Sequence, residues 1–234
     1  MPRSTTQLNL LPRDFFDRPS VAVAPDLLGC LLSHETAEGL VTVRLTEVEA
    51  YMGESDPASH AFRGRTARNA VMYGPPGYAY VYFTYGMHFC VNLVCEPEGH
   101  PSAVLLRAGQ VVDGVPLAAA RRSRRSRSTA VPRDRDLARG PALLCEALGI
   151  DRSQDGADVS TPGSPLRAGA RPEPVPAAGI SSGPRVGISR AADVAWRFWI
   201  TGDPAVSAYR AYAPRRARAK PVTTPTGESG TISH

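Results

Sequence analysis

Residues 80–92 read Tyr-Val-Tyr-Phe-Thr-Tyr-Gly-Met-His-Phe-Cys-Val-Asn, and this aromatic run is the strongest structural signal in the chain. Aromatic and β-branched residues favour strands, whereas glycine permits a tight reversal of the chain. The pattern predicts two strands, at about 78–83 and 88–93, that form a hairpin with Tyr85-Gly86 at its tip. Because alternate side chains on a strand share a face, the hairpin presents a row of rings at Tyr78, Tyr80 and Tyr82.

The next strand signal lies upstream, at residues 40–50, where apolar and polar side chains alternate. Continued alternation places Glu47 and Glu49 on the same face as the apolar residues. A further strand is predicted at 103–107, where a Val-Leu-Leu run is typical of a core.

Helical signals flank these strands. Ser20 is predicted to cap a helix whose apolar residues extend to Leu31, although Pro25 shortens or bends it. Two further helices are predicted at 116–127 and 136–148. The first is alanine-rich and ends in arginines and serines, and the second carries leucines toward the core.

The remaining segments define the extent of the domain. We expect residues 1–212 to form a single domain, because one core stops growing only at roughly 250 to 300 residues. Within it, residues 1–13 are a short lead-in, and residues 156–184 are a variable surface loop rich in Gly, Pro, Ala and Ser. Residues 185–201 return to strand-like alternation. Residues 213–234 are polar, basic and proline-bearing, which predicts a disordered tail.

Charge composition points to a polyanionic partner. The chain has 27 Lys and Arg against 22 Asp and Glu, a net charge of +5 that favours nucleic acid or an anionic membrane surface. Its only lysine is Lys220, in the tail. Catalysis through a Schiff base needs a lysine or N-terminal amine in the pocket, so water is the expected nucleophile.

Cysteine and histidine usage gives no sign of a disulfide scaffold or a metal site. The four cysteines lack the spacing of a zinc site, and the five histidines are scattered, so we expect reduced thiols and no metal. The N-terminus lacks a signal-peptide segment, and no stretch approaches the ~20 apolar residues that span a bilayer. We therefore expect a cytoplasmic protein, nucleoid-associated if the cell is bacterial.

Glu49 is the first candidate for acid–base chemistry. It ends an apolar strand face, where partial desolvation suits a carboxylate to act as a general base. Glu47 lies two residues away, at roughly 7 Å, which is close to the carboxylate spacing of an inverting glycosidase. Both carboxylates are also compatible with a structural or solvated role, since most glutamates are surface residues.

The aromatic residues also have two interpretations. Buried tyrosine hydroxyls need partners, which favours a polar cleft that stacks a flat nucleobase, whereas a hairpin can equally use its rings to fill a core. Tyr85, with Met87 beside it, is placed to wedge between stacked bases, unless the tip folds back onto the body. The arginines at 121–127 form either a solvated face or a set of phosphate contacts.

Taken together, these motifs resemble the alkyladenine (3-methyladenine, N-methylpurine) DNA glycosylase family over about residues 11–209. The resemblance implies an α+β fold: a single mixed domain with a curved, mainly antiparallel sheet, surrounding helices and a protruding β-hairpin. The segments that carry it are Glu49-Ala50-Tyr51, His60, Arg68-Asn69, Tyr80-Val81-Tyr82, Tyr85-Gly86-Met87, Phe89-Cys90, Asn92, Val104-Leu105-Leu106-Arg107 and Arg185-Val186-Gly187.

The resemblance implies a monofunctional glycosylase that acts as a monomer on double-stranded DNA containing damaged purines, without cofactor, metal or membrane. Glu49 would activate a water that attacks C1′ of a flipped nucleotide. Arg107 and the backbone carbonyl of Val186 would hold that water. The implied substrates are 3-methyladenine, 7-methylguanine, hypoxanthine and ethenoadenine.

The remaining implied roles concern binding. Tyr51 and Tyr82 would sandwich the flipped purine, while His60 offers a hydrogen bond to the base edge and Asn92 crowds the 2-amino group of guanine. Tyr85 and Met87 match the residues that enter the duplex. Contacts to the DNA backbone are expected from Arg68, Arg121, Arg122, Arg124 and Arg125.

Two other classes of function stay open on the sequence. Removal of Met1 would expose the amine of Pro2 for a bifunctional glycosylase, although Arg3 stands where that class carries an acid. A non-enzymatic binder of damaged or bent DNA would use the Tyr85 wedge and the arginines alone. Thr84 and His88 flank the wedge where similar family members carry apolar or aromatic residues.

Overall fold

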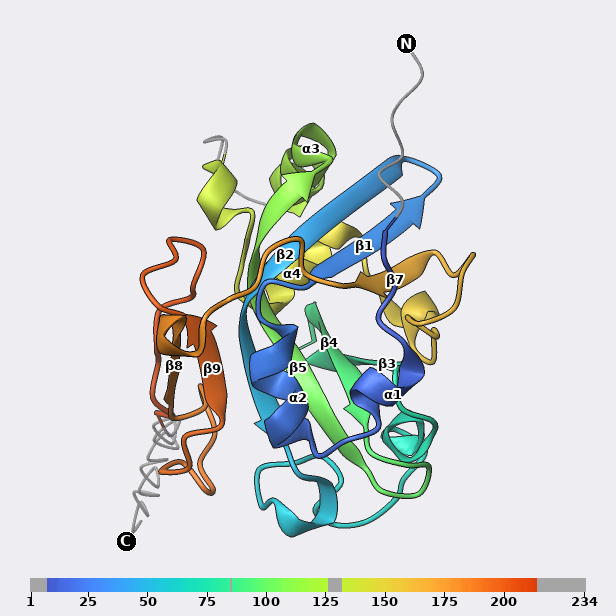
Figure 1. Ribbon diagram of the computed structural model, residues 1–234, viewed down its shortest axis with the longest axis vertical. Coiled ribbons are helices and arrows are strands. Elements are labelled where there is room, and N and C mark those ends of the chain that lie inside the picture. Colours follow the sequence, from blue (N-terminus) through green and yellow to red (C-terminus); the bar gives the residue numbers. More distant parts are fainter. Residues whose placement is uncertain (1–7, 85, 126–131, 214–234) are drawn as a thin grey trace, which may run out of the picture.

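A computed structural model describes residues 8–84, 86–125 and 132–213 (Figure 1). Within these residues nine strands form one sheet, and their pairings are antiparallel. The strands are β1 (Leu31–Thr36), β2 (Gly39–Tyr51), β3 (Ala79–Thr84), β4 (His88–Cys95), β5 (Ser102–Asp113), β6 (Ala138–Arg139), β7 (Leu166–Gly169), β8 (Ile180–Gly183) and β9 (Arg197–Ile200). The main path runs β3-β4-β5-β2-β1-β7, with β6 beside β5 and β9 joining β2 to β8. The predicted α+β fold with a mainly antiparallel sheet is confirmed.

The predicted aromatic hairpin is β3 and β4. Its register pairs Tyr80 with Asn92, Tyr82 with Cys90 and Thr84 with His88. Tyr85, which the sequence places at the tip, lies outside the described residues. Strand β5 begins where a strand was predicted but continues to Asp113, so it forms the long central partner of β2.

Irregular register in β2 changes which face its glutamates occupy. Pairing with β5 shifts between Leu45 and Glu47 and again between Glu47 and Val48. Leu45 and Val48 both belong to the core cluster, although residues three positions apart lie on opposite faces of a regular strand. A bulge moves the alternation by one residue, so Glu47 and Glu49 lie on the face opposite the core. The prediction that they share a face with the apolar residues is wrong.

The same irregularity marks a change of neighbour along one edge of β2. Residues up to Arg44 pair with β1, whereas Glu47 to Glu49 pair with β9, opposite Trp199 to Arg197. The end of β2 that carries both glutamates is therefore enclosed between β5 and β9, close to the C-terminal part of the described chain.

The helices are α1 (Arg13–Phe16), α2 (Ser20–Leu27), α3 (Val115–Arg125) and α4 (Pro141–Leu148). Ser20 is the first residue of α2, and the N-cap position is Pro19. The Ser20 hydroxyl donates to the carbonyl oxygen of Tyr51 at 3.0 Å and makes no capping bond. Helix α2 ends at Leu27, and Leu31 already belongs to β1. Short 3₁₀ turns lie at Gly53–Ser55, Ala70–Tyr73, Asp134–Asp136, Arg152–Gln154 and Ala177–Gly179.

The predicted helix over 136–148 is too long by five residues at its start. Gly140 has φ +132°, a conformation that glycine tolerates and a helix does not use. Pro141 follows at the first helical position, where its fixed φ is favourable. Residues Ala138–Arg139 instead pair with β5 as strand β6.

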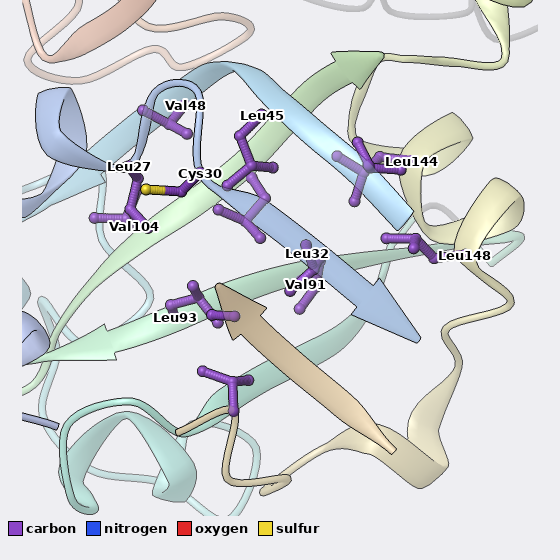
Figure 2. Packing of buried hydrophobic residues seen from close by; sticks show 14 of the residues in the cluster. Leu27, Cys30, Leu32, Leu45, Val48, Val91, Leu93, Val104, Leu144 and Leu148 are labelled. Carbon is purple, nitrogen blue, oxygen red and sulfur yellow. The ribbon is translucent and has the colours of Figure 1, made fainter. Parts of the chain in front are cut away.

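The larger of two hydrophobic clusters in the described residues packs against one face of the sheet and is called the core here. Leu27 of α2 and Leu144 and Leu148 of α4 are fully buried in one cluster with side chains of β1, β2, β4 and β5 (Figure 2). Each such leucine contributes roughly 1.5 to 3 kcal/mol by leaving water. The cluster gives the opposite face of the sheet, which carries the glutamates, a rigid support.

Residues 156–184 contain more structure than the predicted surface loop. Strand β7 extends the sheet beside β1, and β8 pairs with β9. Each strand is only four residues long, so its pattern is too short to recognise in a Gly- and Pro-rich sequence. The predicted strand-like segment 185–201 is a strand only at Arg197–Ile200. Residues 214–234, most of the predicted tail, lie outside the described residues.

Candidate active site

A cavity of about 400 Å³ opens on the face of the sheet opposite the core, a volume within the ordinary range of small-molecule sites. Its walls come from β2, β3, β4 and β5, from the start of α4 and from two loops, at residues 58–60 and 186–188. All seven residues that the sequence assigns to catalysis and base binding line it: Glu49, Tyr51, His60, Tyr82, Asn92, Arg107 and Val186.

The carboxylate of Glu49 is fully buried yet faces this cavity. Its Oε1 accepts a hydrogen bond from the backbone N–H of Val186 at 2.7 Å and lies 3.2 Å from Nη1 of Arg107. Its Oε2 accepts from the hydroxyl of Tyr51 at 2.8 Å. The three donors fix the orientation of the carboxylate while Oε2, with a single bond from the described residues, keeps a lone pair that can accept a proton.

Tyr51 therefore has a second contact that its predicted stacking role does not include. Burial raises the pKa of its hydroxyl well above the ordinary value, and the neighbouring Glu49 raises it further. The hydroxyl therefore stays protonated at neutral pH and can donate to Glu49. Tyr51 thus orients the candidate base as well as presenting a ring to the cavity.

The rings on β3 form the opposite wall. Tyr80 and Tyr82 lie with their ring centroids 5.6 Å apart and their planes inclined by 29°, and the ring of His60 meets Tyr82 edge-on at 4.6 Å. Burial and the Cys90 thiol raise the pKa of Tyr82, and burial raises that of Tyr80 to about 12. These neutral, electron-rich faces suit a flat and cationic ligand.

His60 and Asn92 supply polar groups to the wall. His60 Nδ1 lies 3.0 Å from the hydroxyl of Tyr80, and desolvation of the imidazole together with the charge of Arg68 lowers its pKa. The imidazole is neutral at pH 7 and can accept at one nitrogen and donate at the other. Asn92 is buried and donates from Nδ2 to the carbonyl oxygen of Tyr80 at 3.1 Å, which fixes the amide at the cavity wall.

Glu47 lies beside the cavity but does not line it. Its Oε1 accepts from Nε of Arg107 at 2.8 Å, from Nε of Arg197 at 2.7 Å and from Oγ of Ser207 at 3.0 Å. Its Oε2 accepts from the backbone N–H of Ser207 at 2.7 Å. Burial alone would raise the pKa of Glu47, but Arg107, Ser207 and Arg197 together hold it below the ordinary value. Glu47 is therefore an ionised structural carboxylate.

The family model described as "Methylpurine-DNA glycosylase (MPG)" matches residues 14–204 of this chain. The chain belongs to this family. The resemblance found in the sequence is thereby confirmed. DNA glycosylases hydrolyse N-glycosyl bonds, so membership gives the chain that class of reaction and DNA as its substrate.

Proteins similar to this family member occur in bacteria. A Streptomyces avermitilis protein named "Putative 3-methyladenine DNA glycosylase" is 55% identical over 210 residues, which cover 89% of this chain and 95% of that protein. Proteins of the same name from Leifsonia xyli subsp. xyli and Nocardia farcinica are 52% and 50% identical. Those matches cover 85% and 83% of this chain and 92% and 91% of the two proteins.

Arg185 of this family member lies next to the cavity residue Val186, and sequence analysis assigns it no role. It is among the largest fully buried side chains, and its guanidinium pairs with Asp56 and donates to the carbonyl oxygen of Ala50 at 3.0 Å. It also lies 4.6 Å from the ring centroid of Tyr51. The only sequence signal for Arg185 is its place in the Arg-Val-Gly motif, directly before Val186. Its contact with Tyr51 appears only in the folded protein.

The loop that carries His60 is held by Asn69. The amide of Asn69 donates to the carbonyl oxygens of His60 and Gly64, each at 3.0 Å, and its Oδ1 accepts from the backbone N–H of Thr66 at 2.6 Å. Arg68 next to it is exposed, with its guanidinium carbon 6.0 Å from the ring centroid of Tyr82. The loop thus places one cation at the rim of the cavity.

The arginines of α3 do not behave as one group. Arg121 is buried, and its guanidinium donates to Glu38 at 2.9 Å, to Thr36 at 2.7 Å and to the carbonyl oxygen of Ala147 at 3.3 Å. These bonds hold Arg121 within the fold, and its contact with the DNA backbone stays a prediction. Arg122 pairs with the carboxylate of Glu146, which also lies 3.6 Å from Nδ1 of His88.

Arg124 is the arginine of this group whose described side chain is exposed, at 62%, and it pairs with Glu38 at 2.6 Å. The side chain of Arg125 lies outside the described residues. Thr84 and His88, which flank the predicted wedge, both line the cavity, so their chemistry bears on which base fits.

The thiols of the protein give no sign of disulfide chemistry in the described residues. All four cysteines are buried and unbridged, and burial raises the pKa of Cys90 in the cavity wall. Among the described residues no three His, Cys, Asp or Glu side chains are grouped so that they could hold a metal ion. None of the helices in the described part of the chain combines the length and apolar character needed to cross a bilayer.

Proposed function

We propose that the protein is a monofunctional DNA glycosylase that removes alkylated or deaminated purines from duplex DNA by hydrolysis of the N-glycosidic bond. The observation that carries this proposal is the buried carboxylate of Glu49, oriented by three donors and facing an aromatic cavity. A carboxylate in such a position can accept a proton from a water that would be a weak nucleophile alone.

In the proposed reaction a water held near Glu49 attacks C1′ of the damaged nucleotide. The new bond joins the water oxygen to C1′, the C1′–N bond breaks, and the base leaves with its electron pair. Glu49 takes the proton that the water loses. Arg107, which lies within reach of both glutamates, and the carbonyl oxygen of Val186 are proposed to hold the water.

The cavity supports recognition of a base that has left the duplex. A nucleobase that is stacked inside a duplex cannot reach a carboxylate within a cavity, so we propose that the nucleotide flips out of the duplex. The purine would lie between the rings of Tyr51 and Tyr82, with His60 at its edge. The fixed amide of Asn92 is proposed to exclude guanine by crowding its 2-amino group.

Leaving-group chemistry makes alkylated purines the easier substrates. 3-Methyladenine and 7-methylguanine are cationic in DNA, so they leave as neutral bases and are attracted by the tyrosine faces. Hypoxanthine and ethenoadenine are neutral, and they need a proton or hydrogen bond to leave. We propose that all four are substrates and that the cationic ones are released faster.

Duplex binding is proposed to use the hairpin tip and exposed arginines. Met87 is 57% exposed next to the tip, so its apolar side chain is accessible to a duplex. The part assigned to Tyr85 rests on the sequence alone. Arg68 at the cavity rim and Arg124 on α3 are the exposed cations proposed to contact phosphates.

The test is release of free base from duplexes that carry one hypoxanthine, one ethenoadenine or randomly methylated purines. We expect the wild type to release base and leave an abasic site with an intact strand, and Glu49→Gln to bind the same DNA without release. Glu38→Gln is the control, because Glu38 also accepts from two arginines but lies on another part of the protein.

Two outcomes would replace the proposal. Tight binding without release by the wild type would favour a non-enzymatic binder of damaged DNA. Strand cleavage together with borohydride trapping would favour a bifunctional enzyme that uses the amine of Pro2, a residue outside the described part of the chain.

A further inference from the structure

The proposed reaction leaves a fully buried carboxylate next to the candidate base without a role. Glu47 is fully buried and accepts four hydrogen bonds, from two arginines and from both donors of Ser207. Removing such a group from water is expensive unless its partners compensate for it. The position of this cluster next to the candidate base suggests that it has a role in catalysis.

Its position excludes Glu47 as a base. Three donors meet its Oε1 and one meets its Oε2, and Glu47 does not line the cavity in which water and substrate would meet a base. The pKa of Glu47 is also lowered, because Arg107, Ser207 and Arg197 outweigh the effect of burial. A carboxylate that holds its charge so firmly is a poor proton acceptor.

Arg107 connects the two glutamates. Its Nε donates to Oε1 of Glu47 at 2.8 Å, and its Nη1 lies 3.2 Å from Oε1 of Glu49. A guanidinium without that first partner is free to take a carboxylate with two parallel N–H groups. Glu47 therefore prevents Arg107 from closing over Glu49 in a bidentate pair that would occupy both of its oxygens.

The C-terminal part of the described chain completes this arrangement. Ser207 provides two of the four donors to Glu47, and the carbonyl oxygen of Val206 accepts from Nε of Arg139 at 2.8 Å. The carbonyl oxygen of Arg210 accepts from the N–H of Gly187, next to the Val186 amide that contacts Glu49, at 3.1 Å. Residues 206–210 thus support both sides of the candidate base, although they follow the 14–204 segment that the family model matches.

We infer that Glu47 is a positioning residue which, with Arg197 and Ser207, holds Arg107 so that Glu49 can take a proton from water. This inference rests on the proposed function. Glu47 acts through Arg107 and does not touch the substrate.

The charges around Glu49 determine what removal of Glu47 does. Two buried carboxylates, Glu47 and Glu49, face two buried guanidiniums, Arg107 and Arg197. Arg185 nearby is balanced by Asp56. The other titratable groups that face Glu49 are Tyr51, Tyr82 and Cys90, whose raised pKa values leave them neutral at pH 7.

The experiment measures single-turnover base release against pH for wild type and Glu47→Gln, with the lesion that the wild type releases fastest. We expect a rate lower by about 10- to 100-fold at pH 7, by analogy with the loss of a partner that orients a metal ligand. We also expect the acidic limb of the curve of rate against pH to move to lower pH. In this variant two guanidiniums face one carboxylate, that of Glu49, and favour its ionised form.

Arg197→Gln supplies the opposite charge change in the same cluster. Two carboxylates then share one guanidinium, so the acidic limb should move to higher pH. Glu38→Gln is the matched control, because it removes a carboxylate held by two arginines far from the cavity, and it should leave the limb in place. Shifts of opposite sign cannot come from a general loss of stability.

The inference and the proposed function fail in different ways. If the wild type releases no base, the function fails. If the wild type releases base and Glu49→Gln does not, the function stands. The inference is then overturned by a Glu47→Gln profile like that of the wild type, or by a lower stability with an unmoved limb. If Glu47→Gln does not fold, an unmoved limb in Arg197→Gln overturns it alone.

Discussion

Two clusters at opposite ends of β2 use the same pairing chemistry and serve different ends. At the turn before β2, Glu38 accepts from Arg121 at 2.9 Å and from Arg124 at 2.6 Å. At the far end, Glu47 accepts from Arg107 at 2.8 Å and from Arg197 at 2.7 Å. The side chain of Glu38 is 42% exposed, whereas that of Glu47 is fully buried.

The contrast shows that burial, and not the number of arginine contacts, decides what a glutamate can do here. Water and salt screen the charges around Glu38, so its pairs only dock α3 onto the β1–β2 turn. No such screening reaches Glu47 and Glu49, where one charge more or less changes the whole site. The second cluster also adjoins an aromatic cavity, which the first does not.

The largest expected effect is on stability. Glu47→Ala leaves two buried guanidiniums with one carboxylate between them, which should cost about 3 to 5 kcal/mol of unfolding free energy. Glu38→Ala leaves Arg124 in contact with water, and Arg121 keeps its bonds to Thr36 and the carbonyl oxygen of Ala147, so this variant should lose much less stability. Urea unfolding at neutral pH measures both. Equal losses from the two variants would mean that the comparison between the clusters is wrong.

The next effect concerns catalysis. Tyr51→Phe keeps the ring but removes the hydroxyl that donates to Oε2 of Glu49. A hydrogen bond to a charged group is worth roughly 1.5 to 3 kcal/mol, so base release should slow by about 10- to 100-fold. Binding to the lesion should persist because stacking is retained. An unchanged rate would assign Tyr51 to stacking alone.

Stability should also separate the clusters by its pH and salt dependence. The pKa of Glu47 is lowered in the folded protein, so its stabilisation is present above the unfolded pKa and is lost as pH falls through the folded value. Glu47→Gln should therefore flatten the acid side of the stability curve. The lowered pKa of Glu38, caused by hydrogen bonds from Arg124 and Arg121, acts with the same sign. Unfolding in urea, measured against pH at low and high salt, should find only the Glu38 contribution sensitive to salt; equal sensitivity would contradict this.

The sheet and the residues of the cavity follow from the sequence because their signals are local. Alternation of period two predicts β2, β3 and β4, and motifs on three of the strands supply Glu49, Tyr51, Tyr82 and Asn92. The face on which the glutamates lie does not follow. It depends on a bulge at Leu45–Glu47, which appears only when β5 pairs with β2.

The support of the site is less predictable because it is assembled from distant segments. Glu47 meets Arg197 and Ser207 across 150 and 160 positions of the chain. Nothing local distinguishes these residues from other arginines and serines. The dense arginine run on α3 attracts attention instead, although Arg121 there is spent on Glu38 and the α4 backbone.

The smallest expected effect tests that last point. Arg124 has an exposed side chain whose ion pair with Glu38 is screened, so it can exchange that partner for a phosphate. Arg121 is buried and bonded to Glu38, Thr36 and the carbonyl oxygen of Ala147, so we expect it to keep these partners. Binding of undamaged duplex, measured at several salt concentrations, should show a slope of log K against log salt smaller by about 0.9 in Arg124→Ala. Arg121→Met should leave the slope unchanged even where it lowers stability. A reduced slope in Arg121→Met alone would mean that the buried arginine comes to the surface on DNA, and that burial in the free protein does not separate structural from DNA-binding arginines.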